Sequence, residues 1–402
     1  MELVMRLTSE EQAMLAGDLG PGVKRAMEIV VALGKIYGAR ELVPIASAQV
    51  AGVSYKNLGD AGLGFLRQWA REGARVRVPT MLNPAGMDLA RWRELGVPEG
   101  FARRQMEVIR AFEAMGAVPT CTCTPYLVGN APGLGEHIAW SESSAVSFAN
   151  SVLGARTNRE GGPGALAAAI VGRTAKYGLH LDENRVASYV VEVRCPLRNE
   201  ADFGALGYMV GRRVKNAVPY FRGVEGEQTG LRALGAAMAA SGAVALYHVE
   251  GVTPEAEADM VSPDAETIVV ESLSEGYAAL NSPVEKIDLV SIGCPHASLA
   301  EIEEVARWLE GKRVKAALWV TTARRTRELA EERGFVQTIE AAGGRVLADT
   351  CLVVAPVEAL GFHSLATNSA KMALYAPSYC GLAVRFGSLE QCLEAAVRGV
   401  VR

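Results

Sequence analysis

The amino-acid sequence predicts an α/β protein with largely parallel sheets, and three observations support this fold class. Short apolar runs alternate with amphipathic helical segments along most of the 402 residues. The apolar runs are nearly continuous, as expected for strands that are covered on both faces of a parallel sheet. Half of the residues are hydrophobic and only 21% are charged, so the chain can bury a large core. At roughly 100–200 residues per domain, this length suggests two or three domains.

The first α/β region is expected to span residues 1–125. It opens with helical periodicity over 9–37, where Thr8 and Glu11 form a predicted capping box. Further helices are expected at 57–72 and 99–115. The apolar runs beside these helices predict strands at 41–46, 74–80 and 117–122.

A central region, expected at 126–270, contains helices rich in small residues. The helical patterns cover 143–153, 164–175, 203–214 and 228–240. Strands are expected at 187–195 and 243–249. A glycine-rich stretch, 157–166, is the expected meeting place of two domains.

The C-terminal α/β region, expected at 271–402, returns to strict alternation. Its apolar runs predict strands at 286–294, 314–322 and 345–349. Its helical patterns cover 298–310, 323–333 and 388–398. Alternation of this kind is typical of a parallel sheet with covering helices.

Composition excludes several classes of function. The formal net charge is -4 and basic runs are short, so a nucleic-acid surface is not expected. Apolar runs are too short or too interrupted by charge to span a bilayer, and the N-terminus does not resemble a signal peptide. We therefore expect a cytoplasmic location and no membrane contact. Seven cysteines without CxxC spacing do not form a disulfide framework.

Three of the cysteines follow predicted strands. Cys123, Cys294 and Cys351 each lie at a strand exit, where open α/β sheets gather their ligands. Three thiolates suggest a soft metal, although a tetrahedral zinc ion would need a fourth ligand. An iron–sulfur cluster that is held by three cysteines would leave one iron open. Spacing alone leaves inert, buried cysteines as the alternative, which we expect for the three cysteines away from strand exits, Cys195, Cys380 and Cys392.

Several longer segments make the sequence recognisable over nearly its whole length. They are "SAQVAGVSYKNLGDAG" (47–62), "TCTPY" (122–126), "GEHIAWSESSAVSFANSVLGARTNREGGP" (135–163), "IGCPHASL" (292–299), "DTCLVVAP" (349–356) and "LATNSAKMALY" (365–375). With these motifs the chain resembles the aconitase X family. The long block at 135–163 is the most specific of them.

The resemblance implies three aconitase-like α/β domains around a central cleft. A small swivelling domain completes this fold, and in the two-subunit branch of the family it is a separate polypeptide. The sequence contains no further β-rich unit after residue 398, so we expect a small swivel-domain subunit as the partner in a heterodimer or higher assembly. The resemblance also places the general-base serine on that partner, so no certain catalytic residue is expected in this chain.

The resemblance further implies a cofactor and a set of site residues. The expected cofactor is a [4Fe–4S] cluster with one open iron, held by Cys123, Cys294 and Cys351, with Cys121 as a neighbour. The expected substrate contacts are Gly52, Val53, Ser54, Asn83, Pro84, Ser143, Ser144, Ser369, Ala370 and Lys371. Alanine stands at position 370, where glycine is common in the family. Its methyl group could narrow the approach of the backbone to an anion.

Simpler structural roles compete with these assignments. Ser54 and the pair Ser143–Ser144 could cap helices, and Asn83–Pro84 could form a turn. His296, two residues after Cys294, could be a neighbour of a cluster, but a satisfied structural histidine is the expected role. Glu142 and Asp182 could each form a salt bridge with Arg185 or a similar residue. Arg159 or Arg185 could instead bind a phosphate group of a substrate.

The activity that the resemblance implies is a hydro-lyase reaction. The expected substrate is a phosphorylated hydroxy acid, (R)-5-phosphomevalonate, which would lose water to give trans-anhydromevalonate 5-phosphate in a mevalonate route to isoprenoids. The alternative within the family is dehydration of cis-3-hydroxy-L-proline. An alternative of another class is an inactive aconitase-like scaffold that binds without catalysis.

Overall fold

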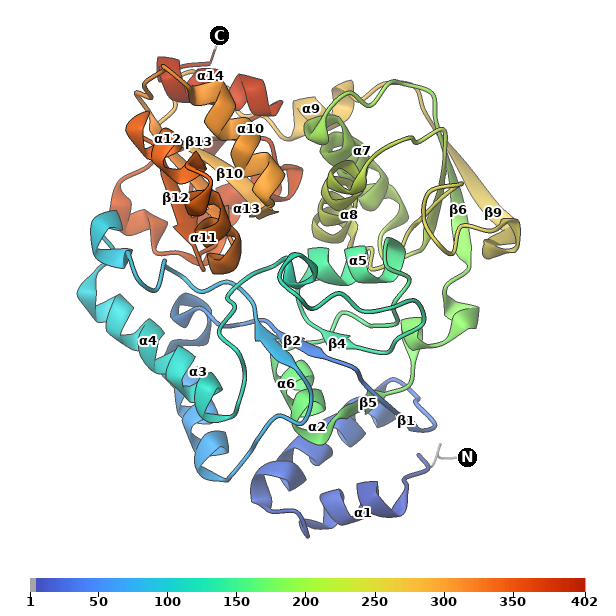
Figure 1. Cartoon of the computed structure of the whole chain (residues 1–402). Helices are drawn as coiled ribbons and strands as arrows, with labels where there is room; N and C mark the ends of the chain where they lie inside the picture. The colour runs from blue at the N-terminus through green and yellow to red at the C-terminus, as the bar shows by residue number, and fades with distance from the viewer. Residues whose placement is uncertain (1–4, 402) are drawn as a thin grey trace.

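Parallel sheets form the framework of the protein, as the sequence predicts. The structure is a computed structural model that describes residues 5–401. Within these residues three parallel sheets contain five, four and three strands, and one short antiparallel pair joins β1 (Leu42–Pro44) to β5 (Arg173–Ala175). None of the helices in this range has the length and apolar character that crossing a membrane requires. Figure 1 shows the sheets and their helices arranged around the middle of the molecule.

The first unit is built on the three-stranded sheet, in the order β3-β2-β4. Its strands are β2 (Ala48–Val50), β3 (Thr80–Leu82) and β4 (Ala139–Trp140). Its helices are α1 (Ser9–Ala16), α2 (Pro21–Ile36), α3 (Tyr55–Arg71), α4 (Glu99–Ala114), α5 (Ser143–Ser151) and α6 (Gly162–Val171). The alanine-rich α6 packs against α2 and β2, because small side chains let the backbones approach closely.

Two strands that we expected in this unit do not form as such. The run at 74–80 becomes a strand only from Thr80, and 117–122 contributes a single bridge between Val118 and Met81. Cys121 adopts a left-handed conformation, with a φ of 45°, which ends any extended run there. Apolar residues alone did not distinguish a strand from a buried loop, because both bury the same side chains.

The second unit carries the four-stranded sheet β8-β7-β6-β9. Its strands are β6 (Ala187–Val193), β7 (Pro219–Arg222), β8 (His248–Val249) and β9 (Val261–Val270). The expected strand at 243–249 is thus reduced to two residues. Its helices are α7 (Glu200–Val214), α8 (Gln228–Gly242) and α9 (Ser274–Ala279). Glycines let α7 and α8 touch: a Cβ on Gly207 would lie 2.5 Å from the carbonyl oxygen of Leu234.

The third unit is a five-stranded sheet in the order β12-β11-β10-β13-β14, with every pair parallel. Its strands are β10 (Leu289–Ala297), β11 (Ala317–Thr322), β12 (Arg345–Ala348), β13 (Ser364–Thr367) and β14 (Ala383–Phe386). Its helices are α10 (Leu299–Leu309), α11 (Arg324–Glu332), α12 (Phe335–Ala341), α13 (Ala370–Cys380) and α14 (Leu389–Arg398). The strand order reverses at β10, and such switch points open a crevice beyond the strand ends.

Short 3-10 helices connect these elements. They are η1 (Trp92–Leu95), η2 (Pro125–Leu127), η3 (Gly178–His180), η4 (Asp182–Asn184), η5 (Ala258–Met260), η6 (Leu352–Val354) and η7 (Val357–Leu360). Two of them, η2 and η6, directly follow predicted cluster cysteines, so these cysteines lie on loops rather than on regular strands.

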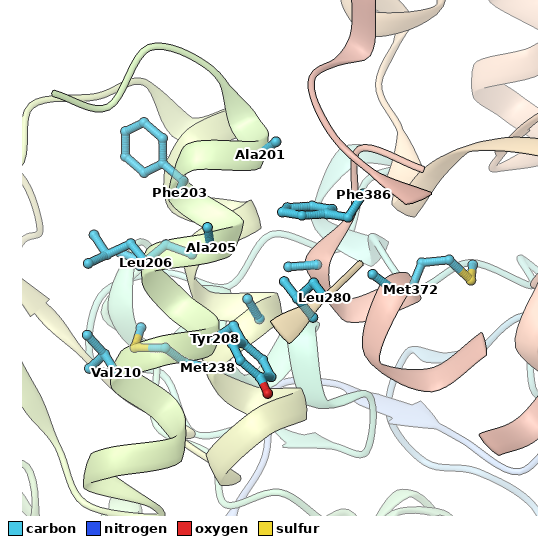
Figure 2. Packing of buried hydrophobic residues seen from close by; sticks show 14 of the residues in the cluster. Ala201, Phe203, Ala205, Leu206, Tyr208, Val210, Met238, Leu280, Met372 and Phe386 are labelled. Carbon is cyan, nitrogen blue, oxygen red and sulfur yellow. The ribbon is translucent and has the colours of Figure 1, made fainter. Parts of the chain in front are cut away.

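The second and third units share one hydrophobic core. Phe203 and Leu206 of α7 and Met238 of α8 belong to the same buried cluster as Met372 of α13 and Phe386 of β14. Figure 2 shows side chains of this cluster on both units, with the Phe386 ring extending towards α7. Burying large apolar side chains stabilises each by roughly 1.5–3 kcal/mol, so this shared core fixes the relative position of the units. The crevice at the switch point is therefore held by a rigid support.

Candidate functional site

Three loops bring the predicted cluster cysteines to the same region. Cys294, which the sequence predicts to follow a strand, instead lies within β10, in a stretch where the pairing with β11 is interrupted between Ile292 and Ala297. Cys351 follows β12 and precedes η6, and Cys123 precedes η2. The backbone N–H of His296, two residues after Cys294, donates a hydrogen bond to the Cys123 sulfur at 3.1 Å. The three loops therefore meet beside the switch point of the five-stranded sheet.

The three thiols share one electrostatic environment. Burial raises the pKa of Cys123 well above its ordinary value, with further contributions from Glu142 and from the Cys294 thiol. Burial, and next the Cys294 sulfur, raises the pKa of Cys351 to about 12. Burial also raises the pKa of Cys294. Thiols in this setting stay protonated until a cation supplies the compensating positive charge.

The arrangement was tested against the chemistry of a metal centre. Among residues 5–401, no three His, Cys, Asp or Glu side chains are arranged to hold a metal ion. An iron–sulfur cluster takes its cysteines on separate irons, so its thiolates need not converge on one point. Three soft sulfur donors, one of them supported by an N–H donor, fit such a cluster in chemical type. A hard divalent cation would require oxygen ligands.

Cys121 is separated from this group. It is fully buried in the core of the first unit, together with Leu82 and Ala85. Burial raises the pKa of its thiol well above the ordinary value. The segment that contains Cys121 and Cys123 is not a strand, so the two thiols are not placed on one side by strand alternation.

A buried ion pair lies beside the thiols. The Nζ of Lys371, in the first turn of α13, donates to Glu142 Oε1 and lies 3.3 Å from the hydroxyls of Ser143 and Ser144. Burial opposes the charge of Glu142, but the adjacent ammonium outweighs it and lowers the pKa of the carboxyl to about 2. Burial likewise opposes the charge of Lys371, and the carboxylate of Glu142 raises its pKa above the ordinary value.

Glu142 is the centre of this group, although the sequence did not single it out as a site residue. Its other oxygen accepts a hydrogen bond of 2.7 Å from Asn83, and its side chain caps α5 through the backbone N–H of Ser144. Four predicted contacts, Asn83, Ser143, Ser144 and Lys371, thus converge on one unpredicted carboxylate. Glu142 does form a salt bridge, but its partner is Lys371, and Arg185 pairs with Glu255 instead.

Within the described chain one buried polar atom of this group has no partner, whereas the ammonium of Lys371 is held by Glu142, Ser143 and Ser144. The Oδ1 atom of Asn83 is buried and has no hydrogen-bond partner within the described residues. The ammonium of Lys371 supplies a positive charge, and helices α5 and α13 both begin beside it. Backbone N–H groups at helix N-termini favour negative charge. This arrangement can therefore hold a carboxylate or a phosphate.

The remaining predicted contacts occupy supporting positions. Ser54 caps α3 and donates a 2.7 Å hydrogen bond to the carbonyl oxygen of Val354, so it ties the first unit to the Cys351 loop. Gly52 is exposed and has a φ of 79°, and Val53 and Pro84 are buried. The Ser54 hydroxyl thus caps α3 and also holds the loop that follows Cys351.

Ser369 and Ala370 lie at the start of α13. The Ser369 hydroxyl caps the helix by accepting from the N–H of Met372 at 3.1 Å. Ser369 also lines a cavity of about 20 Å³ together with Cys294, enough for one water molecule. The Ala370 methyl packs toward α7, where a Cβ on Gly204 would lie 2.9 Å from it. The methyl therefore fills a contact between helices.

A second buried charge cluster lines the same small cavity. Arg232 of α8 is 6% exposed and forms ion pairs with Glu301 and Glu200, at 2.5 and 3.5 Å. Burial, and next the charge of Glu301, raises the pKa of Glu200 to about 8. Sequence reasoning missed these residues because each lies in an ordinary helical pattern. The only sequence signal was a charged residue on an otherwise apolar helix face.

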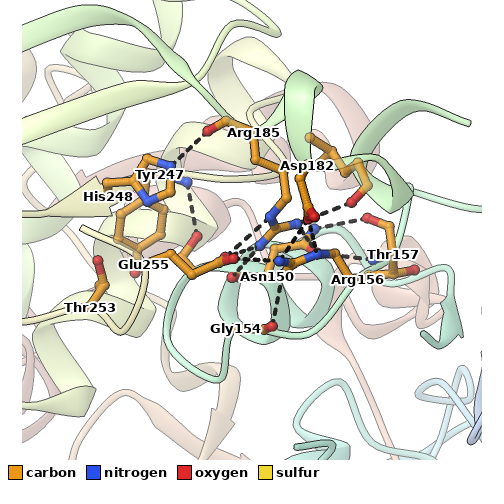
Figure 3. A network of polar contacts seen from close by, with 12 residues as sticks. Asn150, Gly154, Arg156, Thr157, Asp182, Arg185, Tyr247, His248, Thr253 and Glu255 are labelled. Carbon is orange, nitrogen blue, oxygen red and sulfur yellow. Dashed lines mark hydrogen bonds and ion pairs between the residues drawn. The ribbon is translucent and has the colours of Figure 1, made fainter. Parts of the chain in front are cut away.

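Arg185 is not available to a phosphate. Its guanidinium is fully buried and donates to Glu255, to Asn150 and to the carbonyl oxygen of Leu179. Figure 3 shows this network, in which Asp182 pairs with Arg156. All donor atoms of Arg185 are thus used inside the protein, and its position in a recognisable motif reflects a structural role.

Arg159, the other expected phosphate ligand, is exposed, and its backbone pairs with Trp140, two residues before Glu142. Larger grooves, of about 560 and 570 Å³, lie away from the thiols, one beside Arg385 and one beside Arg212. Neither is lined by a predicted site residue. Of the predicted residues, Cys294, Ser369 and Ala370 line the cavity of about 20 Å³, and Gly52 lines a separate, mostly apolar pocket of about 160 Å³.

Comparisons with known proteins identify the family of the chain. Models of the aconitase X first, second and third domains match residues 4–183, 187–275 and 287–398. A solved structure, Thermococcus kodakaraensis aconitase X in its holo-form, is 49% identical to the chain. It superposes with a TM-score of 0.92 and covers 98% of this chain and 100% of that one.

Three curated relatives extend the comparison. The phosphomevalonate dehydratase large subunit of Methanocaldococcus jannaschii is 50% identical, over 97% of this chain and 100% of its own length. That of Methanothermobacter thermautotrophicus is 53% identical, over 94% of this chain and 95% of its own length. The cis-3-hydroxy-L-proline dehydratase of Pseudomonas aeruginosa is 40% identical, over 98% of this chain and 70% of its own length. The chain belongs to the aconitase X family.

Proposed function

We propose that the chain is the large subunit of a hydro-lyase that dehydrates (R)-5-phosphomevalonate to trans-anhydromevalonate 5-phosphate, in a mevalonate route to isoprenoids. The observation that carries the proposal is the buried Lys371, held between Glu142 and two serine hydroxyls beside three cysteines. Relatives with about 50% identity over their full length bear the name phosphomevalonate dehydratase large subunit. Their identity to this chain exceeds that of the hydroxyproline dehydratases, at 40% and 37%.

Cys123, Cys294 and Cys351 are the residues that would hold a [4Fe–4S] cluster with one open iron. When it is bound, such a cluster supplies a Lewis acid that makes the substrate hydroxyl a better leaving group. The hydrogen bond from the His296 N–H to Cys123 would stabilise a thiolate at that position. The raised thiol pKa values mean that cluster loading must release protons from the three cysteines.

The protein's own polar groups bind and orient the substrate in this proposal. Lys371 provides the positive charge for a carboxylate or phosphate. Ser143 and Ser144 hold its ammonium in place, because their hydroxyls accept from Nζ and donate to Glu142. Glu142 fixes the position of the ammonium, and the free Oδ1 of Asn83 can accept a hydrogen bond from a substrate hydroxyl. These groups sit in a buried crevice, where charged hydrogen bonds are stronger than in water.

The second part of the proposal concerns a partner chain. Several relatives are named large subunits, which implies a small subunit in those proteins. We assign to the corresponding partner of this chain a swivelling domain that closes the crevice and carries the general-base serine. In this assignment the large chain positions the substrate and the partner removes its acidic proton.

The test is co-expression of the chain with a small subunit, followed by anaerobic reconstitution with iron and sulfide. Both phosphomevalonate and cis-3-hydroxy-L-proline are then assayed for loss of water. Dehydration of phosphomevalonate by the complex, and none by the large chain alone, is the expected result. Turnover of hydroxyproline instead would replace the substrate, and full turnover by the large chain alone would overturn the two-subunit assignment. A complex without iron and sulfide would indicate an inactive scaffold.

A further inference from the structure

His296 lies where the three cysteine loops meet, and it contacts two of them directly. Its Nδ1 is 3.0 Å from the hydroxyl of Thr122, the residue before Cys123. Its Nε2 is 2.7 Å from the carbonyl oxygen of Thr350, the residue before Cys351. His296 itself follows Cys294 by two residues. One side chain thus joins the loops of all three cysteines.

The two ring contacts have a defined direction. A carbonyl oxygen can only accept, so Nε2 carries the proton and donates to Thr350. In the neutral ring Nδ1 then accepts from the Thr122 hydroxyl. The Thr122 oxygen in turn lies 3.1 Å from the Thr124 hydroxyl and accepts the Thr124 backbone N–H at 3.1 Å. The chain of hydrogen bonds fixes the loop on both sides of Cys123.

The surroundings allow His296 little freedom. The residue is 1% exposed, and its backbone N–H is held by the Cys123 sulfur at 3.1 Å. Every polar atom of the ring is therefore paired within the protein. Replacing the ring with an apolar one would leave the Thr350 carbonyl and the Thr122 hydroxyl without their present partners, and unpaired buried groups are costly.

We propose that His296 is a positioning residue, which holds the loops of Cys123, Cys294 and Cys351 in register for the iron–sulfur cluster. The inference rests on the proposed function, because it concerns how the cluster is retained. Partners that hold a metal's ligands in place commonly change metal affinity by 10–100-fold when they are removed. The role of His296 therefore predicts a change in cluster retention that is larger than its effect on folding.

Three substitutions of His296 separate its two ring contacts. His296→Gln keeps a donor near the Nε2 position, so it can still reach the Thr350 carbonyl. His296→Asn keeps an acceptor near the Nδ1 position, so it can still accept from Thr122. His296→Phe removes both contacts while it fills the same space. Thr122→Val removes the hydroxyl alone and leaves the histidine in place.

A matched control is available elsewhere in the chain. His248 is also fully buried, and its Nε2 lies 2.8 Å from a backbone carbonyl oxygen, that of Arg185. It is part of the network in Figure 3, which contains none of the three cysteines. His248→Phe should therefore lower thermal stability to a similar degree as His296→Phe, without a direct effect on the cysteine loops.

The experiment compares cluster retention with folding in the complex of large chain and small subunit. Each variant is reconstituted anaerobically and its iron and sulfide contents are determined. The cluster is then challenged with an iron chelator, and the fading of its visible absorbance gives a rate of loss. Thermal unfolding of the same samples reports the stability of the fold.

We expect the cluster of His296→Phe to be lost at least tenfold faster than that of wild type, with His296→Gln, His296→Asn and Thr122→Val in between. His248→Phe should stay within twofold of wild type. Equal loss rates in wild type and all His296 variants would overturn the inference while the proposed function stands. A wild-type complex that takes up no iron and sulfide would overturn the proposed function and the inference with it. If His296→Phe does not fold, the rates of cluster loss in His296→Gln, His296→Asn and Thr122→Val test the inference instead.

Discussion

Replacing Glu142 with glutamine tests the buried ion pair on which the proposed substrate site depends. The substitution removes one charge and keeps the shape of the side chain. The folded pKa of Glu142 is about 2, against an ordinary value of 4.5. At roughly 1.4 kcal/mol per pH unit, this difference corresponds to about 3 kcal/mol of stability at neutral pH. The side chains of Lys371 and Glu142 are only 10% and 14% exposed, so screening by solvent is weak.

The sign of the pH dependence follows from the lowered pKa. A depressed carboxyl pKa stabilises the folded state above the ordinary value, and the contribution is lost as the pH falls from about 4.5 towards 2. Glu142→Gln should therefore be about 3 kcal/mol less stable than wild type at pH 7. The difference should shrink below pH 4. The buried ammonium of Lys371 that remains without its partner adds to the cost at neutral pH.

The assay is urea unfolding followed by tryptophan fluorescence at pH 7 and pH 3, with Lys371→Met and the double variant completing a cycle. We expect a coupling free energy of about 2–3 kcal/mol between the two residues. Glu358→Gln is the matched control, because Glu358 pairs with Lys56 at 2.6 Å but its side chain is 53% exposed. Exposed pairs contribute about 0–1 kcal/mol. A Glu142→Gln protein as stable as this control at pH 7 would refute the reasoning.

The remaining predictions concern the cysteines, the arginine network and α13. Cys123→Ser should abolish iron and sulfide uptake whereas Cys121→Ser should keep both, and equal loss in the two variants would contradict the ligand assignment. Arg185→Gln should lower the unfolding free energy by roughly 3 kcal/mol and leave the KM for the phosphorylated substrate unchanged, because the donors of Arg185 are all used inside the protein. A large rise in KM alone would mean that Arg185 binds the substrate. Ala370→Gly should cost about 0.5–1 kcal/mol in thermal unfolding and change kcat/KM by less than threefold, because the methyl packs toward Gly204; a large gain in kcat/KM would show that the methyl obstructs the substrate.

Local sequence patterns predicted most of the helices within one to three residues of their observed ends. The helices at 99–115, 298–310 and 388–398 are clear cases, because an apolar face of period 3.6 and a polar cap are local properties. Strands were harder. The runs at 74–80 and 117–122 contain apolar residues among polar ones, as many strands do, but whether they pair depends on which segments lie beside them.

Capping explains part of the difficulty at the site. Ser54, Ser369 and Glu142 all cap helices, and two of them were expected to be substrate contacts from their motifs. Capping and ligand binding use the same side-chain oxygens at helix N-termini, so residue type does not separate the two roles. What separates them is the partner that each side chain meets in space.

The sequence by itself determined the fold class, the parallel sheets, the position of Cys351 after a strand and the small polar residues at helix starts. These features follow from periodicity and from local backbone preferences, which need only neighbouring residues. Only the tertiary structure decided that Glu142 would meet Lys371, 229 residues away, and that Arg185 would be used up by an internal network. Those contacts depend on how the three units pack, two of them around a shared core. No local pattern records that packing, because each residue carries the same helical signal whichever distant partner it faces.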